Sequence, residues 1–344
     1  MSTIFYSTFI TGFEKVIEEA LLLRLKKVIV QTVGDGFIVY RTDSSMDDIK
    51  RLKFLNNSFV FLKKMEGTSG KTINDLLLEV IKDKAMVRDI HTAFKGKRHT
   101  IRIRASVENQ FVGVDKALQK KVEQVLIGQG NLTVDRSLAD LELWVSMRKE
   151  GFTLFGVRFT KRANYEKTLA KGELYPELTY LLCLLSDPKK EDVFLDPFCG
   201  SGAIALQRAS SFPCKQVLAG DVDASLVNAL RKRIERSRNK ITVGRWDARK
   251  LATFDTASVD AVVTDPPWGN YGTTDIDLDA LYHDMLIEFS RVLKPYGTLV
   301  VLTAQYELFE SKLADVEESL VLIAQYHTLV SGRKAGVFVV KRAP

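Results

Sequence analysis

The sequence predicts an α/β protein with a doubly wound, mostly parallel sheet in its carboxyl-terminal half and smaller α+β units before it. From about Pro176 onward, short apolar runs alternate with longer helical stretches, which is typical of parallel βαβ units. Between residues 1 and 160, strand-like runs, a hairpin signal and amphipathic helices follow one another without this regular alternation. The two halves also differ in charge, which supports a boundary between them.

Length and composition limit the class of protein. The chain has 344 residues, of which 46% are hydrophobic and 27% are charged, a balance that suits two or three globular domains. Its three cysteines lack C-x-x-C spacing and only four histidines are present, so no metal site is expected. No apolar run is long enough to cross a membrane, and the first ten residues lack the features of a signal peptide. We therefore expect a cytoplasmic protein without a membrane partner.

Positive charge is concentrated in the first half of the chain. Residues 1–170 contain 29 Lys and Arg against 20 Asp and Glu, whereas residues 171–344 contain 21 against 23. A basic module joined to a nearly neutral one indicates a polyanion-binding part coupled to a part with another task. The same bias also occurs as ordinary variation in surface composition.

The first 66 residues have the pattern of a small α+β unit. Ile4–Ile10 is expected to form a strand, and the apolar residues after it recur at helical spacing. Val28–Val33 and Phe37–Tyr40 flank a Gly-Asp-Gly turn, which predicts a hairpin. A further strand is expected near Phe59–Leu62.

A Gly-Thr-Ser-Gly break at residues 67–70 precedes a second α+β unit. We expect helices over Thr72–Lys84 and Asp115–Leu126, and strands over Thr100–Ser106, Leu141–Met147 and Thr153–Arg158. Basic residues surround the first of these strands, and period-two alternation places two arginines on one face and two isoleucines on the other. The candidate polyanion-binding residues are Lys95, Lys97, Arg98, Arg102 and Arg104.

A glycine turn follows the first strand of the carboxyl-terminal half. The strand Val193–Leu195 leads into Asp196-Pro197-Phe198-Cys199-Gly200-Ser201-Gly202, and a helix begins at Ala203. This order lets backbone N–H groups approach a ligand at a helix N-terminus. The spacing is not the GxGxxG of dinucleotide enzymes and no Walker lysine follows, so neither NAD nor ATP is expected. Taken alone, the turn could equally be structural.

Acidic residues follow the next two strands. Asp221 ends the strand Gln216–Asp221, 19 positions after Gly202, where nucleoside-binding α/β folds hold a ribose diol. Asp223 is better placed to cap the next helix. Asp247, after the third strand of this half, could accept a hydrogen bond from an adenine amino group.

The fourth strand, Ala261–Thr264, ends in Asp265-Pro266-Pro267-Trp268. Consecutive prolines fix the backbone and leave their carbonyls free as acceptors. Asp265 and the Pro266 carbonyl can accept the two hydrogens of an exocyclic base amine while Trp268 stacks on the ring. Two acceptors would orient this poor nucleophile toward an electrophilic methyl group. A stiffened loop explains any one of these residues, and less readily all four at a strand end.

In this order, DPFCGSG, GDVD, WDA and DPPW resemble the motifs of class I S-adenosylmethionine-dependent methyltransferases that act on exocyclic amines. The resemblance implies a Rossmann-like methyltransferase domain over residues 176–344, with Asp265, Pro266 and Trp268 as catalytic residues. Tyrosine or phenylalanine is more usual at the position of Trp268. The segment KGELYP also looks like one in RNA guanine-N2 methyltransferases. The residues thereby assigned to S-adenosyl-L-methionine are Pro176, Asp196, Phe198, Cys199, Gly200, Ser201, Gly202, Asp221, Asp247 and Ala248.

The front half resembles known RNA-binding modules. Residues 67–162, with KGKRHTIRIRAS and EGFTLFGVRFTKR, resemble a THUMP domain, and residues 1–66 look like the ferredoxin-like domain that often precedes it. Residues 163–175 would form a linker. SGRKAGVFVVKR near the carboxyl end is similar to the closing strands of THUMP-linked guanine-N2 tRNA methyltransferases. The resemblance implies an enzyme that forms N2-methylguanosine in tRNA, in the acceptor-stem region, and whose five basic residues named above help to hold the 3′ acceptor end.

Three alternatives remain at the level of sequence. A 23S rRNA guanine-N2 methyltransferase can also carry THUMP, although such enzymes tend to have Asn where this chain has Asp265. A non-catalytic RNA-binding THUMP scaffold would be expected to have lost the glycine pair or the Asp-Pro-Pro residues. A DNA adenine methyltransferase has no reason to carry THUMP, although DPPW alone does not separate guanine N2 from adenine N6 or cytosine N4. The need for a small activating protein partner stays open.

Overall fold

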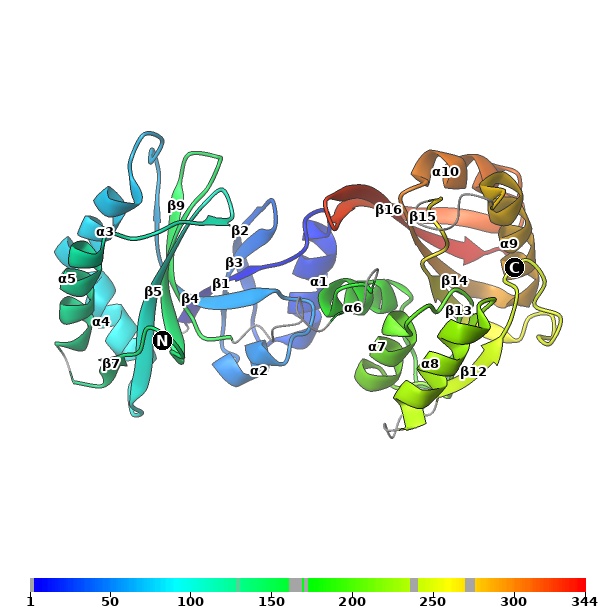
Figure 1. The fold of residues 1–344 in the computed structure, drawn as a ribbon, viewed down its shortest axis with the longest axis horizontal. Coiled ribbons are helices and arrows are strands. Elements are labelled where there is room, and N and C mark those ends of the chain that lie inside the picture. Colours follow the sequence, from blue (N-terminus) through cyan, green and yellow to red (C-terminus); the bar gives the residue numbers. More distant parts are fainter. Residues whose placement is uncertain (1–2, 129, 161–168, 170–172, 236–240, 270–275) are drawn as a thin grey trace. The chain divides into compact units, whose positions relative to one another are not determined.

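The computed structural model describes residues 3–128, 130–160, 169, 173–235, 241–269 and 276–344 (Figure 1). The chain divides into two compact units. The first comprises Met1–Phe9 and Glu14–Ala163, and the second comprises Ile10–Phe13 and Asn164–Pro344. Each unit contains one sheet, and each is described by itself. None of the described helices is both long and apolar enough to cross a membrane.

The first unit is built around a nine-stranded sheet. Its strands are β1 (Thr3–Thr8), β2 (Ile29–Gly34), β3 (Phe37–Thr42), β4 (Asn57–Met65), β5 (His99–Val107), β6 (Gln110–Phe111), β7 (Leu132–Val134), β8 (Leu141–Met147) and β9 (Thr153–Arg158). Its helices are α1 (Glu14–Arg24), α2 (Met46–Lys50), α3 (Ile73–Lys82), α4 (Lys84–Ala93) and α5 (Lys116–Ile127). The order is β2-β3-β1-β4-β9-β8-β5-β6, with β7 paired to β5, and α3, α4 and α5 cover one side of the strands around β5 (Figure 1).

The elements predicted for this unit are present, and the structure adds α2, α4, β6 and β7. The hairpin of β2 and β3 forms, and β8 and β9 have the predicted bounds. The helix expected over Thr72–Lys84 is α3, which begins with a capping box of Thr72 and Asp75. Helix α3 ends at Asp83, which is also the N-cap of α4. The Asp83 side chain accepts a hydrogen bond from the Met86 N–H and so begins α4, a helix that was not predicted from the sequence.

One sheet spans the boundary predicted between residues 66 and 67. Strand β4 lies before this boundary and pairs antiparallel with β9, from Phe59↔Arg158 to Met65↔Thr153. The division into a ferredoxin-like segment and a THUMP segment stays a prediction. The linker predicted over residues 163–175 lies largely outside the described residues.

The second unit is built around a seven-stranded sheet of order β12-β11-β10-β13-β14-β16-β15. Its strands are β10 (Val193–Asp196), β11 (Gln216–Asp221), β12 (Ile241–Arg245), β13 (Val259–Thr264), β14 (Leu293–Thr303), β15 (Leu320–Val330) and β16 (Arg333–Arg342). Its helices are α6 (Pro176–Leu185), α7 (Ala203–Ser211), α8 (Ala224–Glu235), α9 (Leu278–Val292) and α10 (Tyr306–Ala314). Strands β10 to β14 are parallel, and β16 runs antiparallel between β14 and β15.

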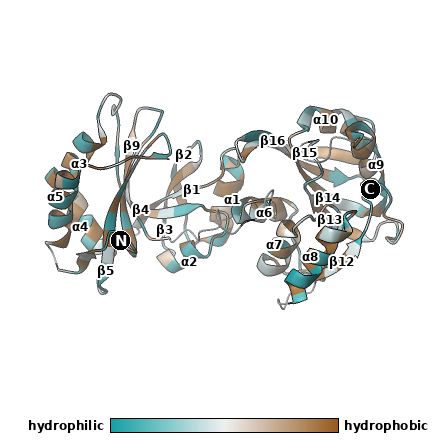
Figure 2. Ribbon diagram, viewed as in Figure 1, coloured by the Kyte–Doolittle hydropathy of each residue, from teal (hydrophilic) through white to brown (hydrophobic). Residues whose placement is uncertain are grey.

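This arrangement confirms an α/β protein with a mostly parallel sheet in the second half. Helices α6, α7 and α8 lie on one side of the sheet, and α9 and α10 lie on the other (Figure 1). Helix α8 is amphipathic and carries both hydrophobic and hydrophilic residues (Figure 2). Its Val227 and Leu230 are buried, whereas Lys232 faces solvent. From β10 the chain first adds β11 and β12 on one side and then adds β13 and β14 on the other side. At such a switch point the connections leave the two central strands in opposite directions, which opens a crevice at the carboxyl ends of the strands.

Candidate active site

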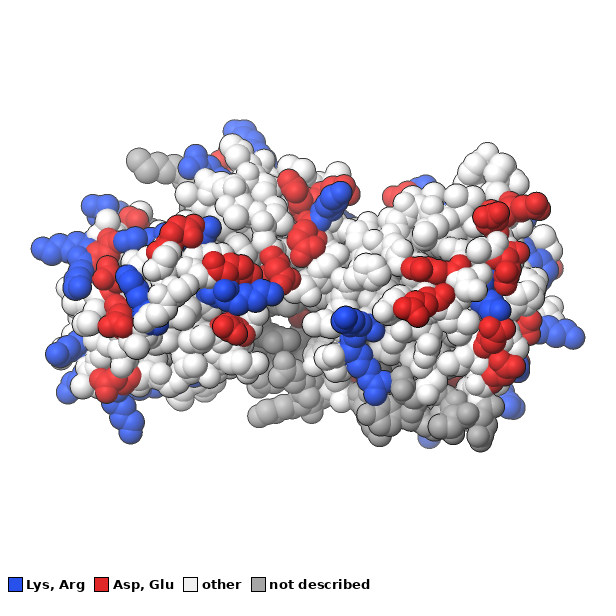
Figure 3. Space-filling view, turned by 90° about the horizontal axis from the view of Figure 1, so that it is seen from above, with Lys and Arg blue, Asp and Glu red and all other residues white. Residues whose placement is uncertain are grey.

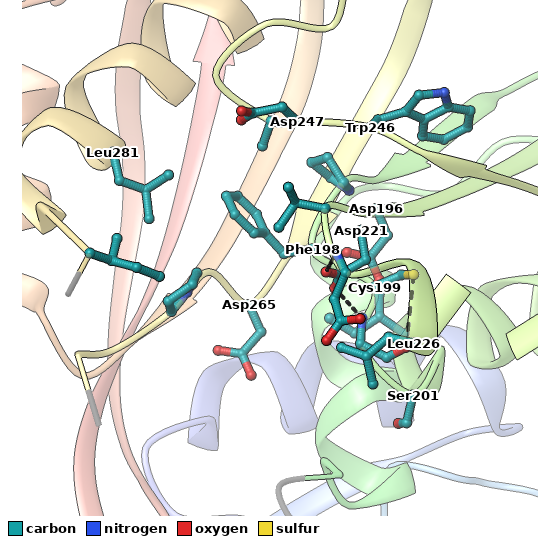
Figure 4. A pocket seen from close by; sticks show the side chains of 18 of the residues that line it. Asp196, Phe198, Cys199, Ser201, Asp221, Leu226, Trp246, Asp247, Asp265 and Leu281 are labelled. Carbon is teal, nitrogen blue, oxygen red and sulfur yellow. Dashed lines mark hydrogen bonds between the residues drawn. The ribbon is translucent and has the colours of Figure 1, made fainter. Parts of the chain in front are cut away.

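A cavity of about 780 Å³ lies at this switch point. Its walls come from the ends of β10, β11 and β13, from the starts of α7 and α8 and from the first turn of α9. The size is that of a site for a small organic molecule. In the view of Figure 4, Phe198 lies between Asp247 and Asp265, and Asp196 and Asp221 lie together to one side.

Backbone hydrogen bonds shape the glycine turn at one side of the cavity. The Cys199 N–H donates to the Gly220 carbonyl at 2.8 Å, and the Gly202 N–H donates to the Cys199 carbonyl at 2.7 Å. The Gly200 N–H donates to Asp221 Oδ2 at 3.1 Å, so the turn after β10 is joined directly to the end of β11. The remaining oxygen, Asp221 Oδ1, accepts the N–H of Asp223 at 2.9 Å.

The two glycines of the turn serve different purposes. Both have positive φ, +49° at Gly200 and +87° at Gly202, which favours glycine at each. A Cβ atom at Gly202 would lie 2.3 Å from Leu230 Cδ1, so this glycine is required by packing against α8. A Cβ atom at Gly200 would meet no protein atom within 4 Å. Gly200 therefore keeps space open in the cavity itself.

Negative charge dominates the cavity wall. Of the described lining residues, seven are Asp or Glu and one is Arg. Burial raises the pKa of Asp196 to about 8 and that of Asp265 to about 7, and it also raises the pKa of Asp221. Asp196 Oδ1 accepts the hydroxyl of Thr264 at 2.9 Å, whereas its buried Oδ2 has no partner among the described residues. Such a site favours a ligand that carries positive charge.

The side chain of Asp247 is held by a neighbouring arginine. Arg249 donates to both carboxylate oxygens at 2.7 to 3.2 Å, and this hydrogen bonding lowers the pKa of Asp247. The adjacent Trp246 ring occupies the space above Gly220 and Gly244, where a Cβ atom would lie 2.2 Å from it. An adenine amine at Asp247 would therefore share the carboxylate with Arg249.

The Asp-Pro-Pro-Trp segment is fixed by two polar side chains from other elements. The Tyr282 hydroxyl donates to the Pro267 carbonyl at 3.0 Å and also contacts the Thr303 hydroxyl at 2.7 Å. The Gln305 amide donates to the Trp268 carbonyl at 2.8 Å. Among the described residues, none donates to the carbonyl of Pro266, so this carbonyl is available as an acceptor.

Most of the predicted cofactor residues line the cavity, and some do not. Pro176 occupies the first turn of α6 and Gly202 packs against α8, and neither forms part of the wall. Of the three predicted catalytic residues, Asp265 lines the cavity, whereas Pro266 and Trp268 do not. The lining residues that were predicted are Asp196, Phe198, Cys199, Gly200, Ser201, Asp221, Asp247, Ala248 and Asp265.

Sequence reasoning missed several residues of the wall. Glu173 lines the cavity and accepts a hydrogen bond from Arg233 at 2.8 Å, and Arg233 also donates to the Ser201 carbonyl. Glu173 belongs to the KGELYP segment, so a signal for it was present. Leu226 and Leu281 also line the cavity. The sequence does not distinguish a cavity-lining leucine on a helix from one that packs in the core, so these two residues could not be predicted.

The predicted polyanion-binding residues lie in the first unit and differ in their surroundings. Lys95, Lys97 and Arg98 are exposed. The predicted alternation of β5 is confirmed, because Ile101 and Ile103 are buried and Arg102 and Arg104 are not. Arg102 nevertheless donates to the buried carboxylate of Glu142 through both Nε and Nη2, which neutralises much of its charge.

The environment of Glu142 reduces the positive charge of this sheet face. Arg158 Nη2 lies 2.6 Å from Glu142 Oε2, and the Trp144 indole donates to the same oxygen at 2.7 Å. Arg104 is half exposed and lies farther from this carboxylate, at 3.8 Å. On the face seen in Figure 3, basic and acidic residues are interspersed.

Among the described residues, no three His, Cys, Asp or Glu side chains are grouped to hold a metal ion.

Residues 163–325 match the family model of the RMKL-like methyltransferase domain. The chain is 30% identical over 219 residues to the tRNA (guanine(6)-N2)-methyltransferase of Thermus thermophilus, which covers 62% of this chain and 65% of that protein. It is 27% identical over 230 residues to the Bos taurus tRNA (guanine(6)-N(2))-methyltransferase THUMP3, covering 61% and 44%. The matches thus span less than two thirds of the length of these two relatives.

Solved structures resemble the chain over nearly its whole length. TrmN from Thermus thermophilus superimposes with a TM-score of 0.75 at 23% identity, covering 99% of both chains. A predicted N6-adenine-specific DNA methylase from Listeria monocytogenes gives a TM-score of 0.68 at 17% identity, covering 100% and 97%. At these identities the similarity concerns the fold, and it includes both units.

Proposed function

We propose that this chain, whose carboxyl-terminal unit is related to the class I S-adenosylmethionine-dependent tRNA guanine-N2 methyltransferases, methylates the N2 amine of a guanosine in tRNA. The single observation that carries the proposal is the position of Asp265 in the wall of the cavity that the glycine turn at Gly200 also lines. The names of the curated relatives support guanine N2 as the acceptor and tRNA as the substrate.

The cavity fits S-adenosyl-L-methionine on three counts. Gly200 leaves open space at a helix N-terminus, the wall is predominantly acidic, and Asp221 ends β11 where a ribose diol would be held. S-adenosyl-L-methionine carries a positive sulfonium group and supplies an electrophilic methyl group when bound. The buried Oδ2 of Asp196, which lacks a partner among the described residues, could accept a further hydrogen bond there.

Asp265 and the Pro266 carbonyl would hold the acceptor amine. Each accepts one N2 hydrogen, which directs the nitrogen lone pair away from the ring and toward the methyl group. As N2 takes up the methyl group, the bond from that group to the sulfonium sulfur would break, S-adenosyl-L-homocysteine would be the leaving product, and one N2 proton would move to the Asp265 carboxylate. A pKa of about 7 suits this carboxylate to accept a proton near neutral pH. Trp268 would cover one face of the extruded base.

The identity of the product tests the proposal. The full chain is incubated with an unmodified tRNA transcript and S-adenosylmethionine carrying a labelled methyl group, and digested nucleosides are analysed by mass spectrometry. We expect labelled N2-methylguanosine among the nucleosides, and mass spectrometry of oligonucleotide fragments from a partial digest should place it in the acceptor-stem region. Labelled N6-methyladenosine, or no labelled nucleoside, would overturn the proposal. A parallel incubation with 23S rRNA distinguishes the ribosomal alternative, because that substrate alone would then be labelled.

Substituting the two glycines of the turn should separate cofactor binding from folding. Gly200→Ala and Gly202→Ala both place alanine at positive φ, which should cost each variant about 1–2 kcal/mol of folding stability. The new methyl group enters the cavity in Gly200→Ala and meets Leu230 in Gly202→Ala. We expect calorimetry to show cofactor affinity reduced at least about tenfold in Gly200→Ala, and denaturation to show the larger loss of stability in Gly202→Ala. The reverse pattern would contradict this division.

The exposed basic residues before β5 should contribute to tRNA affinity. Replacing Lys95, Lys97 and Arg98 by glutamine in the full chain should weaken tRNA binding and reduce the slope of log affinity against log salt by about two to three. The triple variant Lys189→Gln, Lys190→Gln, Lys215→Gln removes the same charge from exposed positions of the second unit and serves as the control. Equal losses in filter binding by both triple variants would indicate a general charge effect.

A further inference from the structure

The indole of Trp268 makes a hydrogen bond that its expected stacking role does not require. Trp268 Nε1 donates to Asp265 Oδ1 at 2.8 Å. Among the described residues, Trp268 is the one side chain that donates a hydrogen bond to this carboxylate. Tyrosine and phenylalanine, which are more usual at this position in related motifs, have no N–H group. The interaction is therefore particular to the tryptophan of this chain.

The backbone around Trp268 is held firmly enough to maintain this contact. The Trp268 carbonyl accepts the Gln305 amide, and the Gln305 N–H in turn donates to the Thr303 hydroxyl at 2.9 Å. Tyr282 holds the preceding proline carbonyl. Gly269 follows with φ of +73°, and a Cβ atom there would lie 2.7 Å from Leu278 Cδ1. These contacts involve β14, the start of α10 and α9, so three elements fix the segment that carries the indole.

The surroundings of Asp265 otherwise oppose its ionised form. Among the described residues, the titratable groups that interact with its charge are Asp196 at the end of β10 and Tyr282 on α9, and neither supplies positive charge. Burial raises the pKa of Asp265, and the Trp268 N–H is the group that lowers it. If protonated, Asp265 would offer a hydrogen to an amine that needs an acceptor. The acceptor role therefore depends on a donor that stabilises the carboxylate.

We propose that Trp268 is a positioning residue for Asp265: its indole N–H occupies Oδ1 and thereby keeps the carboxylate ionised and reserves Oδ2 for the acceptor amine. The inference rests on the proposed function, because it assigns Trp268 a second task in amine methylation. It also explains why a tryptophan can serve at a position where an aromatic face alone would suffice for stacking.

The test compares the pH dependence of kcat/KM in the wild-type chain and in Trp268→Phe. Phenylalanine keeps an aromatic face and loses the N–H group. Activity should rise with pH as Asp265 loses its proton, and without the indole donor this rise should move upward by about one to two pH units. Trp268→Phe should therefore lose most activity near pH 7 and recover it at higher pH. A uniform loss at every pH would indicate lost stacking or packing and would overturn the proposal.

A double-mutant cycle separates positioning from a general structural effect. In an Asp265→Asn background there is no carboxyl group to titrate, so adding Trp268→Phe should leave the shape of the pH profile unchanged. If Trp268→Phe shifts the profile equally in both backgrounds, it acts on another group and the proposal fails.

A measurement without catalysis keeps the inference separate from the proposed function. Tryptophan fluorescence of the full chain is titrated with acid and base and compared with that of Asp265→Asn. The wild-type chain should show a transition near neutral pH that the Asn variant lacks, because ionisation of Asp265 changes the environment of the indole. Identical titrations would overturn the inference. If the transition is present but the product is not N2-methylguanosine, the Trp268–Asp265 pairing stands and the proposed function fails.

Discussion

Replacing Asp265 by alanine should lower the rate of methyl transfer by a factor of about 10²–10⁴. The carboxylate is one of two acceptors for the amine, and in the proposed mechanism it also accepts the proton that N2 releases. Its removal leaves the Pro266 carbonyl as the remaining acceptor and frees the Trp268 indole N–H. Single-turnover kinetics with saturating tRNA and cofactor would measure this loss at the chemical step.

Binding should change little in the same variant, because the proposed contacts with cofactor and tRNA backbone involve other residues. Asp265→Asn provides the graded comparison, since its amide oxygen can still accept the Trp268 N–H or one amine hydrogen but cannot take up the proton. We expect the order wild type, then Asn, then Ala. Methylation by Asp265→Ala at the wild-type rate would remove Asp265 from the reaction.

The sequence predicted the framework of the site because strand ends carry recognisable local patterns. Asp196, Asp221 and Asp265 each follow a short apolar run, and parallel strands bring such ends to one edge of the sheet. The bounds of β8, β9 and β11 were also predicted, because their apolar runs are flanked by turns. Helix α4 was missed because the predicted helix ran through Asp83 to Lys84, whereas Asp83 ends α3 and begins a separate helix.

The interactions that tune the site could not be predicted, because they join residues distant in sequence or depend on side-chain rotamers. Glu142 neutralises Arg102 from 40 residues away, so the charge of that strand face was overestimated. Tyr282 and Gln305 support the Asp-Pro-Pro-Trp segment from α9 and the loop before α10. The hydrogen bond from Trp268 to Asp265 joins residues only three positions apart, so their proximity is visible in the sequence. Whether the indole presents its N–H edge or its ring face to the carboxylate is decided by the conformation of the folded loop.

The helix that follows the glycine turn is anchored by a fully buried arginine. Arg208 on α7 pairs with Asp192 at 2.9 Å and also donates to the Pro213 carbonyl at 2.9 Å. Its guanidinium lies between the rings of Phe194 and Phe212, 5.5 and 5.8 Å from their centres. Because Phe194 belongs to β10, this cluster joins α7 to the strand that leads into the turn. Loss of the arginine would leave a buried carboxylate and a carbonyl without their partner.

Arg208→Met should therefore destabilise the second unit by about 3–5 kcal/mol, since methionine preserves much of the volume but leaves Asp192 uncompensated. Trp246 and Trp268 belong to this unit, so their fluorescence during urea unfolding in a Trp144→Phe background reports on it. Adding Asp192→Asn should recover part of the loss, because the uncompensated charge is then removed. Lys232→Met, at an exposed position of the same unit, should change stability by less than about 0.5 kcal/mol and serves as the control. A loss that Asp192→Asn does not reduce would show that Arg208 stabilises the unit by packing against its aromatic neighbours and not by neutralising Asp192.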